Sequence, residues 1–251
     1  MTGTVPVVLA CTAAADDHGM RALRDVATAA GDSEYRIIGG HMVRLLQYAY
    51  RLPGTPRLTS DADTGIDVNV AAEGGFHDQL TGLGYKPEYG NRYVLGDRAV
   101  DLLVPTQVRP GKRIIGERAF DGAPGLRLAL AVAPIQVAVT ARLTDGDTIT
   151  FEIPVPDVEA AFVLKMLART VRASARDLQD IETLLDIVAT EPDYLASPWR
   201  MNDPRVTSGG ERGDAAREAA RMLSGPPTMV PARVRAPLRR HVALPPVDPT
   251  R

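Results

Sequence analysis

The sequence predicts an α+β protein with a helical C-terminal part, on three observations. Strand-like apolar runs are interleaved with helix-like runs up to about residue 155. From residue 158 onward, apolar residues recur at helical spacing. The composition, 45% hydrophobic and 24% charged over 251 residues, is that of a globular chain long enough to bury a core. We expect an α+β core over 1–156, a helical part over 157–224 and a flexible tail over 225–251.

Helix and strand signals alternate through the first half of the core. The first run is rich in helix formers and ends near Gly31, and a later helical run must break at the Pro53 and Pro56 segment. Between them, a short apolar run leads into Gly39 and Gly40. We therefore predict helices over 13–30 and 41–50, and strands over 34–38 and 59–70.

The second half of the core is predicted to consist mainly of strands. Gly96 and Asp97 form a two-residue turn between two strand-like runs, and Asp145 and Gly146 form another. Both patterns are typical of β-hairpins. We predict a helix over 75–83 and strands over 92–95, 98–104, 128–132, 135–143 and 148–155.

Beyond the core the pattern becomes helical and then rich in proline. Helical spacing runs from residue 158 almost to residue 192, and a short helix is predicted over 214–223. The tail that follows contains seven prolines, so we expect it to be poorly ordered. Residues 212–251 hold eight arginines and three acidic residues, so this end is basic while the rest is acidic.

Charge, aromatic content and cysteine usage narrow the function classes. A net charge of −2 provides no global positive field for nucleic acid, and 5% aromatic residues disfavour base stacking as the mode of capture. The single cysteine, Cys11, cannot form an intramolecular disulfide, which indicates a reducing cytoplasm. The apolar run over 5–15 is too short to span a membrane and has no basic residue before it, so neither export nor membrane insertion is expected.

Three carboxylates lie in predicted strands beside apolar residues. Asp61 and Asp63 are two residues apart, so both side chains leave the same face of an extended segment, and Asp101 lies in another strand. Such a set suits Mg²⁺, or Mn²⁺, bound together with a triphosphate. Asp67 is a rival partner for Asp63, but a four-residue spacing fits less well. An Asp-x-Asp pair taken alone is more often a loop or a helix cap.

Gly39 and Gly40 stand between a predicted strand and a predicted helix. Glycine lets the backbone approach phosphate oxygens closely, and a helix N-terminus favours anions. The ordinary alternative is a plain turn. The histidines do not cluster and have no cysteine partners for zinc, and no serine has a Gly-x-Ser-x-Gly setting.

The order of these motifs resembles the nucleotidyltransferase core of DNA polymerase β-like enzymes. A strand, Gly-Gly and a helix are followed by Arg57, Thr59, Asp61 and Asp63 at alternate positions, and then by Val-Asp-Leu-Leu-Val at 100–104. The resemblance implies a mixed sheet with flanking helices. It also implies that Asp61, Asp63 and Asp101 bind metal, and that Gly39, Gly40, Thr59 and Ser60 lie at the nucleotide.

The helical part resembles the AbiEii-type nucleotidyltransferases, the toxins of AbiE-like and MenT-like toxin–antitoxin systems. The matching segments are Phe-Val-Leu-Lys-Met-Leu-Ala at 162–168, then Arg172, and Arg-Asp-Leu-Gln-Asp-Ile at 176–181. The resemblance implies that Lys165 holds the triphosphate and that Asp177 or Asp180 orients this lysine or the acceptor. A solvent-facing Lys165 and an Arg176–Asp180 helix pair remain the alternative.

Together these resemblances imply transfer of a nucleotidyl group from a nucleoside triphosphate such as ATP to an acceptor hydroxyl. Asp101 would help to draw the proton from that hydroxyl. Family relatives act on tRNA 3′ ends, so tRNA is the leading acceptor and a cognate antitoxin the expected protein partner. The alternatives are a small-molecule nucleotidyltransferase of the aminoglycoside-modifying kind and a non-catalytic binding protein with the same fold.

The chain departs from the family pattern near the glycines. His41 and Met42 follow Gly-Gly where small residues are more common, so His41 either narrows the phosphate pocket or contacts the nucleotide. The 20 residues between Gly40 and Asp61 exceed the compact spacing, which we attribute to an insertion over 52–56. Some relatives carry a modified hydroxyl residue near the metal carboxylates, and Thr59 matches that position.

Overall fold

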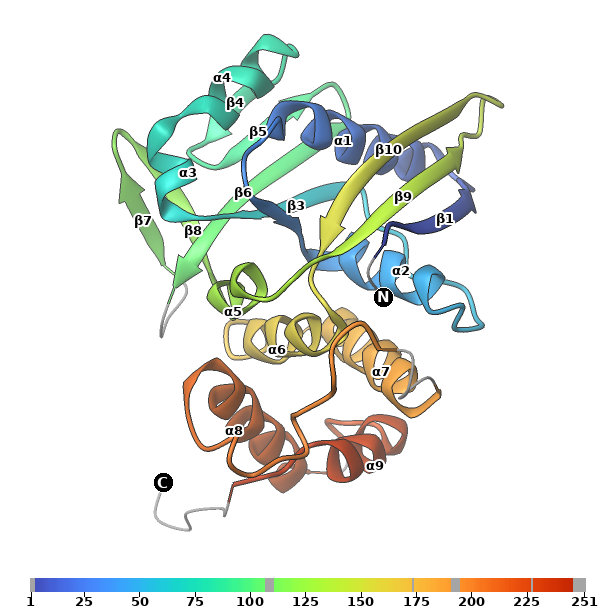
Figure 1. Ribbon diagram of the computed structural model, residues 1–251, viewed down its shortest axis with the longest axis vertical. Coiled ribbons are helices and arrows are strands. Elements are labelled where there is room, and N and C mark those ends of the chain that lie inside the picture. The colour runs from blue at the N-terminus through green and yellow to red at the C-terminus, as the bar shows by residue number, and fades with distance from the viewer. Residues whose placement is uncertain (1–2, 107–110, 173, 191–194, 227, 246–251) are drawn as a thin grey trace.

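The structure is a computed structural model that describes residues 3–106, 111–172, 174–190, 195–226 and 228–245. The predicted fold class is confirmed, because an α+β core is followed by a layer of helices (Figure 1). The helices are α1 Ala14–Ala30, α2 Gly39–Ala49, α3 Val68–Glu73, α4 Gly75–Gly82, α5 Leu126–Ala131, α6 Val158–Ala168, α7 Ala175–Thr190, α8 Gly210–Ser224 and α9 Ala232–His241.

Two sheets form the core. The smaller has the order β1-β9-β10; the larger has the order β2-β3-β6-β5-β4, with β8 paired to β6 and β7 paired to β8. Parallel and antiparallel neighbours occur in both. The strands are β1 Val5–Ala10, β2 Tyr35–Ile37, β3 Asp61–Ile66, β4 Lys86–Tyr89, β5 Arg92–Leu95, β6 Arg98–Thr106, β7 Lys112–Ile115, β8 Arg118–Pro124, β9 Ile135–Arg142 and β10 Thr148–Val155.

Strand β6 is the centre of the larger sheet. Along one side it pairs in parallel with β3, and along the other it pairs first with β5 and then with β8. Alternate residues such as Ala62 and Val100 are fully buried, and α1 packs against both β3 and β6. On the opposite face, Leu126 of α5 packs so close to Gly65 that a Cβ there would overlap it. Helices therefore cover both faces of this sheet.

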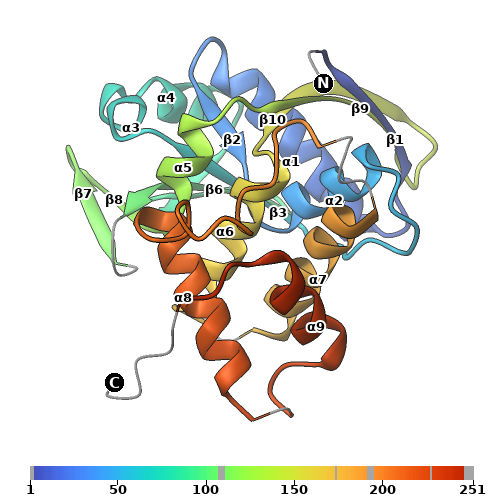
Figure 2. The same ribbon diagram turned by 60° about the horizontal axis from the view of Figure 1, so that its bottom comes forward.

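Helix α6 connects the core to the helical part. It contacts α2, α5 and β8 on the core side and α7 and α8 on the other side. Figure 1 shows α6 and α7 below the sheets and α8 and α9 farther away, and in Figure 2 this helical layer is turned towards the viewer. Its N-cap is Asp157, whose side chain accepts a hydrogen bond from the backbone N–H of Ala160 at 2.8 Å.

Two strand predictions are wrong. Residues 128–132, predicted as a strand, belong mostly to helix α5, and residues 68–70, predicted as a strand end, begin helix α3. The carboxylate of Glu211 accepts hydrogen bonds from the backbone N–H groups of Gly125 at 3.0 Å and Leu128 at 2.7 Å, and so caps the start of α5. This cap comes from α8, far along the chain, and a short apolar run alone does not distinguish helix from strand.

The prediction of a poorly ordered tail is also wrong over Ala232–His241, which form helix α9. Val234 and Leu238 of this helix are fully buried, and α9 packs against α7. Arg235 Nη2 donates a hydrogen bond to the carbonyl oxygen of Leu223 at 2.7 Å, which satisfies the end of α8. The last predicted tail residues, 246–251, lie outside the described residues.

No helix among the described residues has both the length and the apolar character needed to cross a bilayer.

Replacing Leu238 by Ala tests whether the C-terminal helix is part of the folded core. Leu238→Ala should lower the free energy of unfolding by about 2–4 kcal/mol because it leaves a cavity between α9 and α7. The matched control is Arg239→Ala, at the next, exposed position, with an expected change below about 0.5 kcal/mol. Urea denaturation measures both, and equal effects would contradict the packing of α9.

Candidate active site

The three candidate metal aspartates lie on one face of the larger sheet. In the parallel pairing of β3 with β6, Asp63 is opposite Asp101, and Asp61 lies two residues before Asp63. Residues in register or two apart on neighbouring strands share a face, so all three side chains leave the same side of the sheet. The backbone therefore places the three carboxylates on adjacent strands, as predicted.

Burial and mutual repulsion change the ionisation of these carboxylates. The pKa of Asp101 rises to about 6, first because of burial and then because of Asp63, and Arg92 partly offsets the rise. Burial also raises the pKa of Asp63, and the Lys165 ammonium opposes this rise. The Asp63 carboxylate has no ion pair or side-chain hydrogen bond to any described residue. A partly buried acid without a partner gains from a cation.

Arg92 of β5 engages two of the three aspartates. Its Nη1 lies 2.8 Å from Asp101 Oδ2, and its Nη2 lies 3.9 Å from Asp61 Oδ1. Over the described ranges, no three His, Cys, Asp or Glu side chains are arranged as a metal site. Asp101 is thus held by an arginine here, while Asp61 and Asp63 offer the two carboxylates that Mg²⁺ commonly takes from a protein when phosphates complete its shell.

Gly39 and Gly40 form the first turn of α2, so the helix begins at the glycine pair and not after it. Gly39 has φ of 69°, and a Cβ at this position would overlap the Asp63 carboxylate. A Cβ on Gly40 would overlap the guanidinium of Arg57. Both glycines make room for charged side chains of the following segment.

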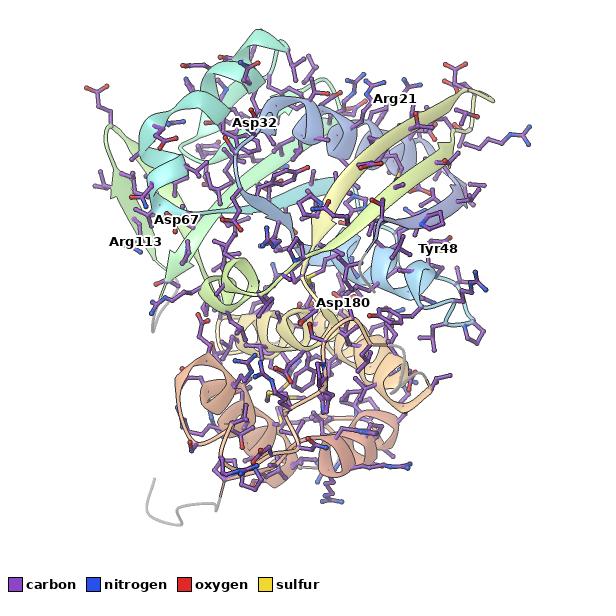
Figure 3. The ribbon with its side chains drawn as sticks, in the orientation of Figure 1. Arg21, Asp32, Tyr48, Asp67, Arg113 and Asp180 are labelled. Atoms are coloured by element: carbon purple, nitrogen blue, oxygen red, sulfur yellow. The ribbon has the colours of Figure 1, made fainter. Side chains whose placement is uncertain are left out.

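Lys165 belongs to a buried cluster of charges. It lies on α6 with its side chain 4% exposed; its Nζ is 2.8 Å from Asp180 Oδ2 and 4.0 Å from Asp177 Oδ1. Both acids lie on α7, and Figure 3 shows Asp180 at the junction between the core and the helical part. The alternative of a solvent-facing lysine is therefore excluded, and of the two acids Asp180 is the nearer.

A pocket of about 360 Å³ lies between the core and α6. It brings together Gly39, Asp63 and Lys165, three of the residues that the sequence singled out, from three different elements. Asp177 and Asp180 lie behind Lys165, and Asp61, Asp101 and Gly40 do not line the pocket. Its wall also includes Ile38, Asp121, Pro124, Leu164, Val171 and Arg172.

The remaining candidates around β3 have identifiable contacts. Ser60 Oγ donates a hydrogen bond to Asp61 Oδ1 at 3.0 Å, and the Thr59 methyl group lies beside Gly40. Asp67, the rival metal ligand, is the N-cap of α3 and accepts a hydrogen bond from the backbone N–H of Asn69 at 2.9 Å. It lies well apart from Asp180 in Figure 3. Asp67 therefore has a structural role at a helix start.

His41 does not line the pocket. Its ring is fully buried against Gly19 of α1, and neither ring nitrogen has a hydrogen-bond partner among the described residues. Its pKa is lowered to about 3, first by burial and then by the nearby Arg44 and Arg57. The expectation that His41 contacts the nucleotide or narrows its pocket is thus not met, because α2 turns this side chain towards α1.

Arg92 is a site residue that sequence reasoning missed, although the signal was present. The two-residue turn at Gly96 and Asp97 fixes the register of its hairpin, and counting back along both strands places Arg92 opposite Asp101. The ion pair between them follows from this register.

Because His41 stays neutral in the folded protein, acid should destabilise the protein through this residue. The unfolded chain binds a proton near pH 6.5, whereas native His41 binds one only near pH 3, so stability is lost as pH falls between these values. His41→Leu should remove this loss, a difference on the order of 3 kcal/mol at about pH 4. Urea unfolding of both proteins from pH 7 to 4 measures it, and parallel stability curves would contradict the prediction.

Comparison with known proteins finds distant structural likeness and no match in sequence. No protein-family model matches the chain, and no curated protein matches it. Among solved structures, the chain is similar to the solution structure of the antibiotic-resistance factor ANT(2″)-Ia, with 15% identity over 68% of this chain and 84% of that chain and a TM-score of 0.41. At this identity and TM-score, the likeness assigns neither a family nor an activity.

Proposed function

We propose that this protein is a nucleotidyltransferase that moves a nucleotidyl group from a nucleoside triphosphate to an acceptor hydroxyl. The observation that supports this most directly is the pocket shared by Asp63, Lys165 and Gly39. Asp63, which has no ion-pair partner among the described residues, lines the same pocket as the buried Lys165, beside the first turn of α2. This combination suits a triphosphate bound with a divalent cation.

Different residues of this chain carry out the separate parts of the transfer. Lys165 binds the triphosphate and neutralises charge that develops on the leaving pyrophosphate. The acceptor oxygen forms a bond to the α-phosphorus while the bond from that phosphorus to pyrophosphate breaks in line. Asp101, whose pKa of about 6 suits a base near neutral pH, takes the hydroxyl proton. Gly39 lets Asp63 approach the helix start.

Asp61 and Asp63 are the residues that would hold Mg²⁺ or Mn²⁺. The cation would offset the negative charge of the triphosphate and of the two carboxylates. Ser60 orients the Asp61 carboxylate by its hydrogen bond, and Arg92 keeps Asp101 and Asp61 ion-paired until substrate enters.

We further propose a tRNA 3′ end as the acceptor. Arg172 supports this choice, because it lines the pocket and its side chain is 65% exposed, and Arg176 follows it at an exposed position. The family resemblance of the helical part adds a toxin role, a cytoplasmic location and a cognate antitoxin to the proposal. A cationic small molecule such as an aminoglycoside is the competing acceptor, since Asp63 and Asp121 also line the pocket.

The transferase proposal predicts a metal-dependent label transfer that depends on Asp63. Purified protein with each of the four α-labelled nucleoside triphosphates, Mg²⁺ and total tRNA should label tRNA, and Asp63→Asn should slow the labelling at least about a hundredfold. Asp67→Asn is the matched control: asparagine caps helices as well as aspartate does, so labelling should stay within about twofold of the wild type.

The outcomes separate the competing functions. Label on an aminoglycoside and none on tRNA would replace the acceptor, and nucleotide binding without transfer to either would indicate a non-catalytic binding protein. An equal loss of labelling in Asp63→Asn and Asp67→Asn would contradict a role of Asp63 in the active site.

The toxin proposal predicts that expression of the wild-type chain arrests bacterial growth. Lys165→Ala should relieve the arrest, because the triphosphate loses its cation and transfer slows by at least about a hundredfold. Growth curves after induction measure this, with Arg205→Ala as the control, since the Arg205 side chain is 91% exposed and its ion pair is with Asp203. Arrest by Lys165→Ala at an equal protein level would contradict a toxin activity at this site.

A further inference from the structure

Arg57 occupies a defined place behind the candidate active site. It lies in the segment between α2 and β3, and its guanidinium forms a two-point contact with Asp180 of α7, from Nε to Oδ1 and from Nη2 to Oδ2, both at 3.2 Å. The Arg57 side chain is 20% exposed and that of Asp180 is 3% exposed. A two-point contact of this kind fixes the plane of a carboxylate, which a single contact does not.

Helix α2 confines the same guanidinium from another direction. A Cβ on Gly40 would overlap Arg57 Nη2, so the arginine lies directly against the backbone of the first helical turn. Arg57 is thus held between α2 and α7, four residues before Asp61. One side chain thereby connects the helical part to the segment that leads into β3.

Asp180, whose carboxylate Arg57 holds in place, also contacts Lys165. Its Oδ2 contacts both Arg57 Nη2 at 3.2 Å and Lys165 Nζ at 2.8 Å. The other acid near the ammonium, Asp177, is at 4.0 Å and is itself 3.4 Å from Arg172 Nε. The orientation of the Asp180 carboxylate therefore sets where the ammonium lies relative to the pocket.

We propose that Arg57 is a positioning residue that holds the Lys165 ammonium at the pocket by fixing Asp180. The inference rests on the proposed function, in which Lys165 binds the triphosphate. Arg57 is not among the residues that line the 360 Å³ pocket, so its effect is transmitted through Asp180. Without Arg57, the Asp180 carboxylate can rotate and the ammonium follows it away from the substrate.

A second pocket gives experimental access to Arg57. This pocket, of about 490 Å³, is lined by Arg57 together with residues of α2, α7 and α9, among them Gln47, Leu178 and Arg233. Truncation of Arg57 would therefore leave a space that opens into this pocket. A free guanidinium ion can enter that space and restore the two-point contact with Asp180.

The lysine content allows the position of Lys165 to be measured directly. The chain contains three lysines, and Lys86 and Lys112 are exposed while Lys165 is buried. In ¹⁵N-lysine NMR of the full-length protein, Arg57→Ala should make hydrogen exchange at the Lys165 ammonium at least about tenfold faster, with the other two signals unchanged. Millimolar guanidinium should reverse the change. Arg233→Ala is the matched control, because Arg233 lines the same pocket but pairs with Glu182 at 2.7 Å.

A second variant and an activity assay complete the test. Arg57→Lys keeps the charge but cannot make both contacts, so it should also accelerate exchange at Lys165. In the transfer assay, Arg57→Ala should lower kcat/KM for the triphosphate at least about tenfold, with recovery in guanidinium, and Arg233→Ala should not. If the wild-type protein transfers no nucleotidyl group, the proposed function fails. The NMR result then still decides whether Arg57 positions the Lys165 ammonium. An unchanged Lys165 signal in both Arg57 variants would overturn the inference.

Discussion

The parallel pairing of β3 with β6 is the constraint on which the candidate site depends. It places Asp63 beside Asp101, and because side chains alternate along a strand, it turns Asp61, Asp63 and Asp101 to one face and Ala62 and Val100 to the other. A shift of one residue in this register would turn the carboxylates towards α1 and the apolar residues to the face that now carries the carboxylates. The same pairing that builds the core therefore orients the polar face towards α6.

Charge is concentrated where the core meets the helical part. Arg57, Lys165 and Arg172 contact two acids, Asp177 and Asp180, and the acids and Lys165 are almost fully buried. Removing such groups from water is costly, and their attraction often only offsets that cost, so stability alone does not account for the cluster. In the proposed function its geometry serves the site instead, because it holds Lys165 in the wall of the pocket that Asp63 also lines.

Gly39 and Gly40 stand at the start of α2 because charged side chains approach the helix backbone closely there. The sequence predicts that Gly39 and Gly40 lie close to phosphate oxygens. In the structure they make room for the Asp63 carboxylate and the Arg57 guanidinium, and of the two only Gly39 lines the pocket. Gly19 similarly admits the buried ring of His41. In each case the missing Cβ allows a polar side chain from another segment to pack against the helix backbone.

The sequence by itself determined the fold class, most of the strands and helices, and the face shared by Asp61 and Asp63, because periodicity and turn residues act locally. The register that pairs Arg92 with Asp101 could also have been counted from the hairpin turn. Only the tertiary structure decided that residues 128–132 are helical, that Ala232–His241 form a helix, and that Asp180 is nearer to Lys165 than Asp177 is. In the structure Glu211 caps α5, α7 packs against α9, and Arg57 pairs with Asp180. These partners are distant in the chain, and local sequence patterns contain no information about which distant side chain will meet them.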